Sequence, residues 1–305
     1  MLIGSDLGHH DPAPAGFRHD AFVYTDEDDF VRQAGAYARD GLATGETVVA
    51  VLPEERNSLL RKALEGIADQ VIFLDMTQLG RNPARIIPLW RTLLEQAPDI
   101  PLRGLGEPAY PGRSSAELEE AALHELLLDV AFDEVPGRFH LRCPYSAALP
   151  LDPDDVHLAA TGDARDSAEA AFRSPLPAVP ARAERQEFGR GDLNVVRQRV
   201  NAAARAFGLP EERVEDLELA LHEICTNTVR FGGGSGTLSW WPADGHLICD
   251  VADSGRIDNL LVGRVLPPAE GLGGRGVWLA NQLCDLVQVR SGSAGTQVRL
   301  HTRVR

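Results

Sequence analysis

The residues best placed to do chemistry together are a carboxylate and an amide one helical turn apart. Glu223 and Asn227 lie in the stretch Glu223-Ile-Cys-Thr-Asn227, and a spacing of four places both side chains on one face of a helix. An amide oxygen suits Mg²⁺, and a carboxylate can accept a proton from an attacking hydroxyl or water. Because such a pair is also common on solvated helix faces, it indicates a site only together with other motifs.

A second candidate group is the carboxylate of Asp253. It ends an alternating, strand-like segment and stands two residues before Gly255. A carboxylate fixed at a strand end can accept a hydrogen bond from an exocyclic amine such as that of adenine. An Asx turn that closes a hairpin would produce the same sequence and is the structural alternative.

A glycine-rich stretch comes next and runs into a short helical pattern. Its glycines are Gly271, Gly273, Gly274 and Gly276. They allow backbone N–H groups to face an anion at a helix N-terminus, which favours a lid over phosphates, although a plain loop is the alternative. A dinucleotide fold is disfavoured, because the stretch lacks the strand and the acidic partner of the Rossmann fingerprint.

In this fixed order the three motifs resemble the ATPase superfamily of gyrase, the mismatch-repair ATPases and the histidine kinases, known as GHKL, with the Bergerat fold. The likeness covers Asp192 to Arg303. It implies ATP and Mg²⁺ as cofactors, Glu223 as the catalytic residue and Asn227 as the Mg²⁺ ligand. The residues that it implies for nucleotide binding are Asn227, Arg230, Asp253, Gly255, Gly271, Gly273, Gly274, Gly276 and Thr296.

Within this superfamily the sequence favours one branch. A histidine kinase needs a phosphoacceptor on a separate helical hairpin, and His222 lies inside the Glu223/Asn227 helix instead. The compact domain resembles the anti-sigma-factor serine/threonine kinases of Gram-positive bacteria. That resemblance implies phosphoryl transfer to a Ser or Thr of an anti-anti-sigma partner, a sigma factor as a further partner, and a homodimer.

The alternative is a nucleotide-bound interaction switch without kinase activity, so the question of an enzyme stays open. The strand-end motif around Arg256 reads Asp253-Ser-Gly-Arg-Ile257 and lacks the second glycine that relatives carry after Gly255. Thr228 and Phe231 replace the family's small residue and His. Glu223 favours the enzyme, since a pure binder does not need a carboxylate beside the γ-phosphate.

The N-terminal half carries a looser resemblance. His19-Asp-Ala-Phe-Val-Tyr24, the Gly45-Glu46 turn and Cys143-Pro-Tyr145 are similar to the MEDS sensory domain over about residues 17–160. The likeness implies a sensor of a small molecule or of redox state, with His19, Tyr24 and Cys143 as its candidate site. A lone His and a lone Cys are also common as structural residues.

The elements that position these residues follow from apolar periodicity. In the N-terminal half, strand patterns at 21–24, 47–52, 71–74, 102–105 and 138–142 alternate with helices that begin near Glu27, Pro53, Pro83 and Ser114. This alternation predicts an α/β domain with a mostly parallel sheet. After residue 190, two helices (from Leu193 and Glu211), strands at 236–241 and 246–252, a helix at 276–284 and strands at 286–290 and 296–302 predict an α+β sandwich.

These patterns divide the chain of 305 residues into two domains. We expect a flexible tail at 1–18, a sensory domain at 19–155, a Pro- and Ala-rich linker at 156–190 and an ATPase domain at 191–305. The net charge of -15 argues against direct nucleic-acid binding, and no apolar run is long enough for a membrane span. Four cysteines without CxxC spacing predict buried thiols in a reducing cytoplasm.

Overall fold

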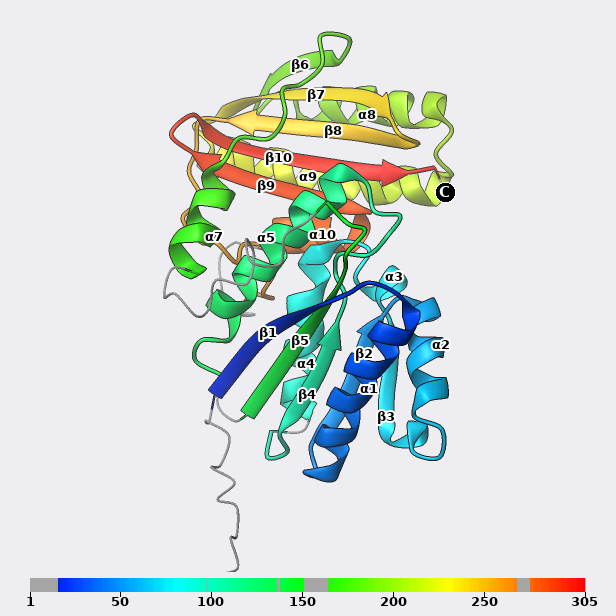
Figure 1. Cartoon of the computed structure of the whole chain (residues 1–305). Helices are drawn as coiled ribbons and strands as arrows, with labels where there is room; N and C mark the ends of the chain where they lie inside the picture. Colours follow the sequence, from blue (N-terminus) through cyan, green and yellow to red (C-terminus); the bar gives the residue numbers. More distant parts are fainter. Residues whose placement is uncertain (1–15, 97, 136–137, 151–163, 268–274, 305) are drawn as a thin grey trace, which may run out of the picture.

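The chain folds into two stacked lobes, each built on its own five-stranded sheet (Figure 1). The computed structural model describes residues 16–96, 98–135, 138–150, 164–267 and 275–304. We call the part built on the first sheet the N-terminal lobe and the part built on the second sheet the C-terminal lobe. Both predicted fold classes are confirmed: a parallel α/β sheet is followed by an antiparallel sheet with helices.

The first sheet is parallel and has the strand order β1-β5-β4-β2-β3. Its strands are β1 (Gly16–Tyr24), β2 (Thr47–Leu52), β3 (Val71–Asp75), β4 (Leu102–Gly106) and β5 (Arg138–Ser146). β1 and β5 lie side by side in register, so that Ala21 is paired with Cys143 and His19 with Leu141. Two residues far apart in the sequence, His19 and Cys143, therefore come to neighbouring strands, as predicted.

Helices cover both faces of this sheet. They are α1 (Glu27–Ala43), α2 (Glu54–Ala63), η1 (Ala68–Gln70), α3 (Met76–Leu79), η2 (Pro83–Arg85), α4 (Ile86–Gln96) and α5 (Ser115–Phe132). α5 begins with a capping box, because the Ser114 hydroxyl accepts from the backbone of Glu117 while the Glu117 carboxylate accepts from the backbone of Ser114. Its buried Leu-rich face packs under β1 and β5 and also meets the C-terminal lobe.

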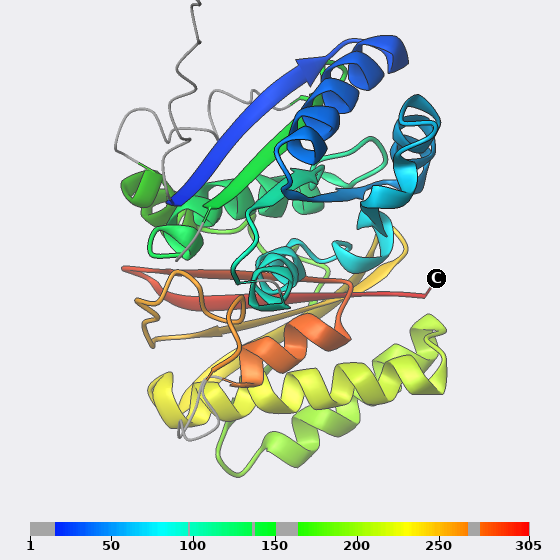
Figure 2. The same ribbon diagram turned by 90° about the horizontal axis from the view of Figure 1, so that it is seen from below.

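The second sheet is antiparallel in the order β6-β7-β8-β10-β9. Its strands are β6 (Glu184–Gly189), β7 (Ser235–Ala243), β8 (His246–Asp253), β9 (Leu286–Gly292) and β10 (Gly295–Arg303), and its helices are α7 (Ala164–Arg173), α8 (Leu193–Phe207), α9 (Glu211–Phe231) and α10 (Arg275–Leu283). Figure 2 shows α8, α9 and α10 on one face of the sheet, with the N-terminal lobe on the other. α8 ends where predicted, at Gly208 with its left-handed φ of 94°.

Two predicted boundaries differ from the structure. The expected linker at 156–190 contains helix α7, which packs against α5 and β9, and strand β6, which pairs with β7. β6 carries Phe188 as its buried residue and is otherwise polar, as suits an edge strand, so it lacks the apolar alternation that reveals a strand. At the other end, β1 starts at Gly16, inside the expected tail, whose residues 1–15 lie outside the described residues.

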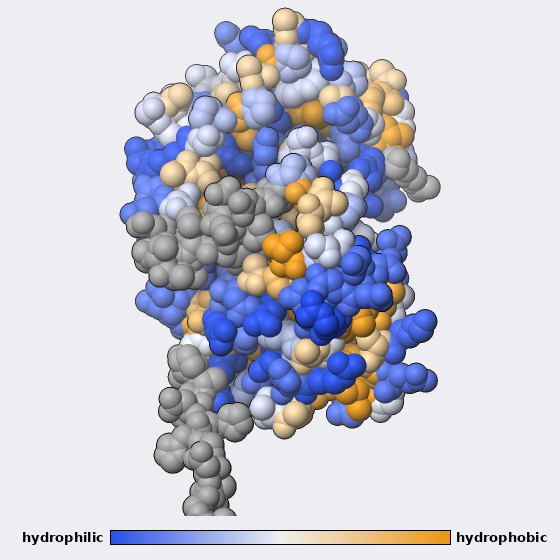
Figure 3. All heavy atoms as spheres, in the orientation of Figure 1, coloured by the Kyte–Doolittle hydropathy of each residue, from blue (hydrophilic) through white to orange (hydrophobic). Residues whose placement is uncertain are grey.

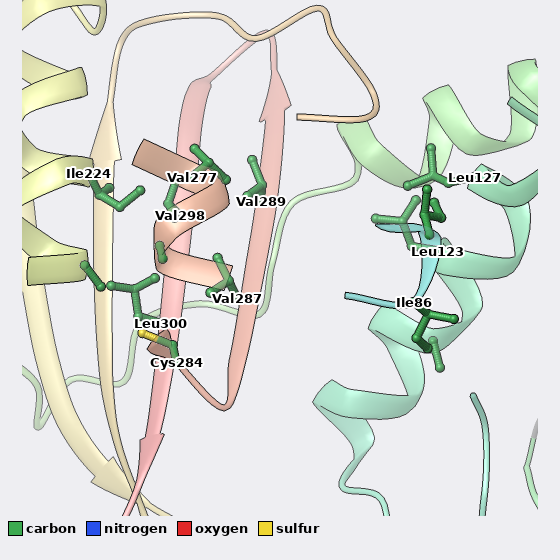
Figure 4. Packing of buried hydrophobic residues seen from close by; sticks show 14 of the residues in the cluster. Ile86, Leu123, Leu127, Ile224, Val277, Cys284, Val287, Val289, Val298 and Leu300 are labelled. Carbon is green, nitrogen blue, oxygen red and sulfur yellow. The ribbon is translucent and has the colours of Figure 1, made fainter. Parts of the chain in front are cut away.

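One hydrophobic cluster runs through both lobes. Six of the residues labelled in Figure 4 show this: Ile86, Leu123 and Leu127 of the N-terminal lobe belong to the same cluster as Val287, Val289 and Val298 of the second sheet. On the face of the molecule seen in Figure 3, hydrophilic residues cover most of the N-terminal lobe, with apolar residues between them. No helix in the described ranges combines the length and apolar character needed to cross a bilayer.

Candidate nucleotide site

A cavity of about 340 Å³ opens between α9, the end of β8 and the start of α10. Its lining includes the predicted residues Asn227, Asp253, Gly255 and Thr296, which come from three different elements. The apolar part of the lining is supplied by Ile224, Ile257, Val262, Val277 and Val298. An apolar slot around one carboxylate suits a flat ring that carries an amine.

Asp253 is held in place by its neighbours. Its Oδ2 accepts a hydrogen bond from the Thr228 hydroxyl at 2.7 Å, and its Oδ1 accepts one from the backbone N–H of Gly255 at 2.8 Å. A carboxylate has about four lone-pair sites, so an acceptor position remains for a ligand amine after these two bonds. The Asp253 carboxylate is therefore both oriented and available.

Thr228 was not among the predicted site residues, although it lines the cavity and orients Asp253. The sequence shows it as a departure from the family pattern, and its role depends on how closely α9 approaches the sheet. Gly236 permits this approach, because a Cβ there would lie 2.6 Å from Thr228 Cγ2. Nothing in the linear spacing of residues 228 and 253 indicates the contact.

Thr296 closes the same side of the cavity through a hydroxyl network. It donates to the carbonyl of Gly255 at 2.9 Å and lies 2.8 Å from the Ser291 hydroxyl, which also accepts from the backbone N–H of Ile257. Gly295 precedes it with φ of 112°, and a Cβ there would lie 2.0 Å from the Asp253 carbonyl oxygen. A glycine is required at this close approach of β10 to β8.

Glu223 and Asn227 share a face of α9, as predicted, and both face the start of α10. A Cβ on Gly276 would lie 2.8 Å from Asn227 Nδ2 and 3.1 Å from Glu223 Oε2. Any side chain at residue 276 would fill the space in front of this pair. Gly276 thus has a steric reason to be glycine, while Gly271, Gly273 and Gly274 lie outside the described residues.

Arg230 lies apart from this cavity. It is absent from the lining, and its guanidinium stacks over the ring of Phe231, 5.0 Å from the ring centroid. Phe231 itself lines the cavity with its side chain largely exposed. Arg256 also lines it, paired with Asp258 at 2.7 Å on the outer rim.

The predicted sensor residues fall into two groups. His19 Nε2 lies 3.4 Å from Cys143 Sγ, but the Tyr24 hydroxyl donates to Glu107, 2.6 Å away on the other face of the sheet. Residues 19 and 24 are an odd number of positions apart on one strand, so their side chains point to opposite faces. Tyr24 is therefore not part of one site with His19 and Cys143.

Comparison with known families agrees with the two lobes. Residues 190–302 match the model of the histidine kinase-like ATPase domain, and residues 18–160 match that of MEDS, the methanogen/methylotroph, DcmR sensory domain. The chain thus combines a MEDS-like region with a histidine-kinase-like ATPase region, as the sequence motifs predicted. No curated protein matches the chain.

Among solved structures, the chain is similar to the RsbU and RsbW domains of Rv1364c from Mycobacterium tuberculosis. The sequence identity is 17% and the TM-score 0.30, over 50% of this chain and 44% of that chain. The present chain thus spans less than half the length of that protein chain.

Proposed function

We propose that the cavity beside α9 binds ATP with Mg²⁺ and that the C-terminal lobe is a serine/threonine kinase of the anti-sigma-factor type. The observation that carries the proposal is that an oriented carboxylate, Asp253, and the amide of Asn227 line one apolar cavity of a histidine-kinase-like ATPase region. Glu223 lies next to Asn227 and faces the start of α10. The N-terminal lobe would regulate this activity as a sensor.

The chain's own residues would divide the work as follows. Asp253 accepts the adenine amine, Thr228 keeps that carboxylate oriented, and the valines and isoleucines of the lining cover the ring. Asn227 offers its amide oxygen to Mg²⁺. Bound MgATP would supply the phosphoryl group, and Glu223 would accept the proton of the Ser or Thr hydroxyl of a partner.

An anti-anti-sigma protein as phosphoacceptor, a sigma factor as second partner, a homodimer and action in the cytoplasm belong to the same proposal. The net charge of -15 supports protein partners over nucleic acid. At the rim around Arg256 and Asp258 the sequence departs from the family pattern. This departure favours the alternative, a nucleotide-bound switch that transfers no phosphoryl group.

Calorimetric titration of MgATP tests the binding site. We expect Asp253→Asn to weaken binding roughly 100-fold, about 3 kcal/mol, because the amide turns a donor toward the adenine amine and toward the Thr228 and Gly255 donors. Asn227→Ala should remove the Mg²⁺-dependent part of the affinity. Glu215→Gln, an exposed change on the same helix, is the matched control and should bind like the wild type.

Transfer is tested separately with radiolabelled ATP and candidate anti-anti-sigma proteins. Glu223→Gln should retain nucleotide binding and lose the labelled Ser or Thr product. Equal affinity in wild type and Asp253→Asn would remove the cavity from nucleotide binding. Tight binding with no labelled product from any partner would leave a nucleotide-bound switch in place of a kinase.

A further inference from the structure

His19, Glu125 and Cys143 form a fully buried cluster in the N-terminal lobe, far from the nucleotide cavity in the sequence. Their donor atoms all lie within 4.8 Å of one another, and the side chains of His19 and Glu125 are 0% and 1% exposed. His19 and Cys143 project from the adjacent strands β1 and β5, and Glu125 reaches them from α5. Among the described residues this is the one group of three such ligands that close together.

The cluster converges on one ring nitrogen. His19 Nε2 lies 3.0 Å from Glu125 Oε2 and 3.4 Å from Cys143 Sγ. The Cys143 thiol also hydrogen-bonds with Glu125, so each of the three side chains contacts the other two. Around a tetrahedral Zn²⁺, with bonds of about 2.0–2.3 Å, neighbouring ligand atoms are roughly 3.2–3.8 Å apart, close to both distances.

A further carboxylate stands behind the imidazole. Asp129 follows Glu125 by one turn of α5, and its Oδ2 lies 3.7 Å from His19 Nδ1. Metal-bound histidines commonly present the other ring nitrogen to a carboxylate, which fixes the ring and increases its basicity. His19 has this arrangement, because its Nδ1 faces Asp129 while its Nε2 faces Glu125 and Cys143.

Charge balance also fits a divalent ion. Zinc binds a deprotonated thiol, a neutral imidazole and a carboxylate. The two positive charges of the ion would balance the negative charges of the Cys143 thiolate and the Glu125 carboxylate, so that the buried cluster would carry no net charge when the ion is bound.

We propose that His19, Glu125 and Cys143 bind Zn²⁺ through Nε2, a carboxylate oxygen and Sγ, with Asp129 positioning the histidine. Imidazole, thiolate and carboxylate are ligands of zinc, and three protein ligands leave a fourth position for water or a small-molecule donor. The sensory lobe would then recognise ligands through a metal ion. Such a metal site would lie entirely within the N-terminal lobe and would not depend on nucleotide binding.

Cobalt(II) is the spectroscopic probe for the full chain, stripped of metal with a chelator and kept reduced. We expect one equivalent of Co²⁺ to give tetrahedral visible bands and a thiolate-to-cobalt charge-transfer band in the near ultraviolet, both abolished by added Zn²⁺. Cys143→Ser should lose the charge-transfer band. Cys249→Ser, at a buried cysteine of the second sheet, is the matched control and should keep it.

Two further measurements separate ligation from folding. Glu125→Gln keeps the size of the side chain and should weaken Zn²⁺ binding at least tenfold, while circular dichroism shows an unchanged fold. Absence of the charge-transfer band in the folded wild type, or its persistence in Cys143→Ser, would overturn the proposal, since metal held elsewhere, for example by His9 and His10, lacks this thiolate.

Discussion

Glu107 is a carboxyl group without solvent contact at the end of β4, and its acid–base behaviour follows from that burial. It is 0% exposed, and Tyr24 donates a 2.6 Å hydrogen bond to it. Burial raises the pKa of Glu107 to about 7, and the Tyr24 hydroxyl offsets part of that rise. The folded protein therefore binds a proton at Glu107 over a pH range in which the unfolded chain has released it.

The sign of the resulting pH dependence is fixed. Between the unfolded pKa of 4.5 and the folded pKa of about 7, the folded state holds the extra proton, so the free energy of unfolding falls as pH rises through this window. Glu107→Gln stays neutral and keeps an acceptor for Tyr24. We expect the wild type to lose up to about 3 kcal/mol relative to Glu107→Gln between about pH 5 and pH 8.

Urea denaturation of both proteins across this range measures the difference. His19, whose pKa is also raised, contributes a decline toward pH 9, but it is present in both proteins and cancels in the comparison. A difference in unfolding free energy that stays constant with pH would contradict a neutral Glu107 in the folded state.

Among individual residues, those that belong to sequence motifs can be predicted, whereas those that orient or contact the motif residues cannot. Asp253 and Thr296 can be predicted from the order of the motifs in the C-terminal lobe. His19 and Cys143 can be predicted from the first and last strand patterns of the N-terminal lobe. Thr228 and Glu125 cannot, because each meets its partner through the rotation of a helix against a sheet. A contact of that kind depends on packing, which a single sequence does not reveal.

Helix α10 connects the N-terminal lobe to the proposed nucleotide cavity, because it lines the cavity at one end and contacts the N-terminal lobe at the other. Its first turn brings Val277 to the cavity and Gly276 against Asn227, and its last carbonyls lie in the interface between the lobes. Arg85 donates to the carbonyls of Asn281 and Gln282 at 2.7 and 2.6 Å. A cation and donor at a helix C-terminus satisfies carbonyls that have no partner within the helix.

We expect Arg85→Ala to destabilise the protein by about 2–3 kcal/mol, because these carbonyls lose a charged donor. Nucleotide binding should weaken as well, since α10 would be less firmly held beside Asn227. Thermal unfolding and MgATP calorimetry measure the two effects. Arg81→Ala is the control: Arg81 also crosses the interface, at 2.7 Å from Asp285, but it is half exposed and should cost under about 1 kcal/mol. Equal losses in the two variants would show that α10 does not depend on Arg85.

Helices and strands with a clear periodicity of apolar residues can be predicted from the sequence. All five strands of the first sheet and four strands of the second appear where the sequence predicts them. β6 and α7 escaped prediction, because β6 is a polar edge strand and α7 is a short, Ala- and charge-rich helix beside a Pro-rich stretch. Both acquire their structure from partners, β6 from β7 and α7 from α5.

The two lobes form one structural unit, since a buried ion pair network joins them besides the shared hydrophobic cluster. Glu120 of α5 lies between Arg264 and Arg290 of the C-terminal lobe, 3.0 Å from Arg290 Nη2. All three side chains are less than 10% exposed. The same helix α5 carries Glu125 and Asp129 of the proposed metal cluster, so a change at that cluster has a direct mechanical route to the second sheet.

This network makes a prediction for the whole molecule. Glu120→Gln keeps the shape of the side chain but leaves two buried guanidinium groups without a counter-charge, which costs about 3–5 kcal/mol. Because the core is continuous across the lobes, we expect the wild type to unfold in one calorimetric transition and the variant to unfold earlier, with the two lobes separating into two transitions. Glu119→Gln, an exposed change on the preceding residue of α5, should leave the single transition in place. Two transitions in the wild type, or a Glu120→Gln protein as stable as Glu119→Gln, would mean that each lobe is stable by itself and that the interface does not couple them.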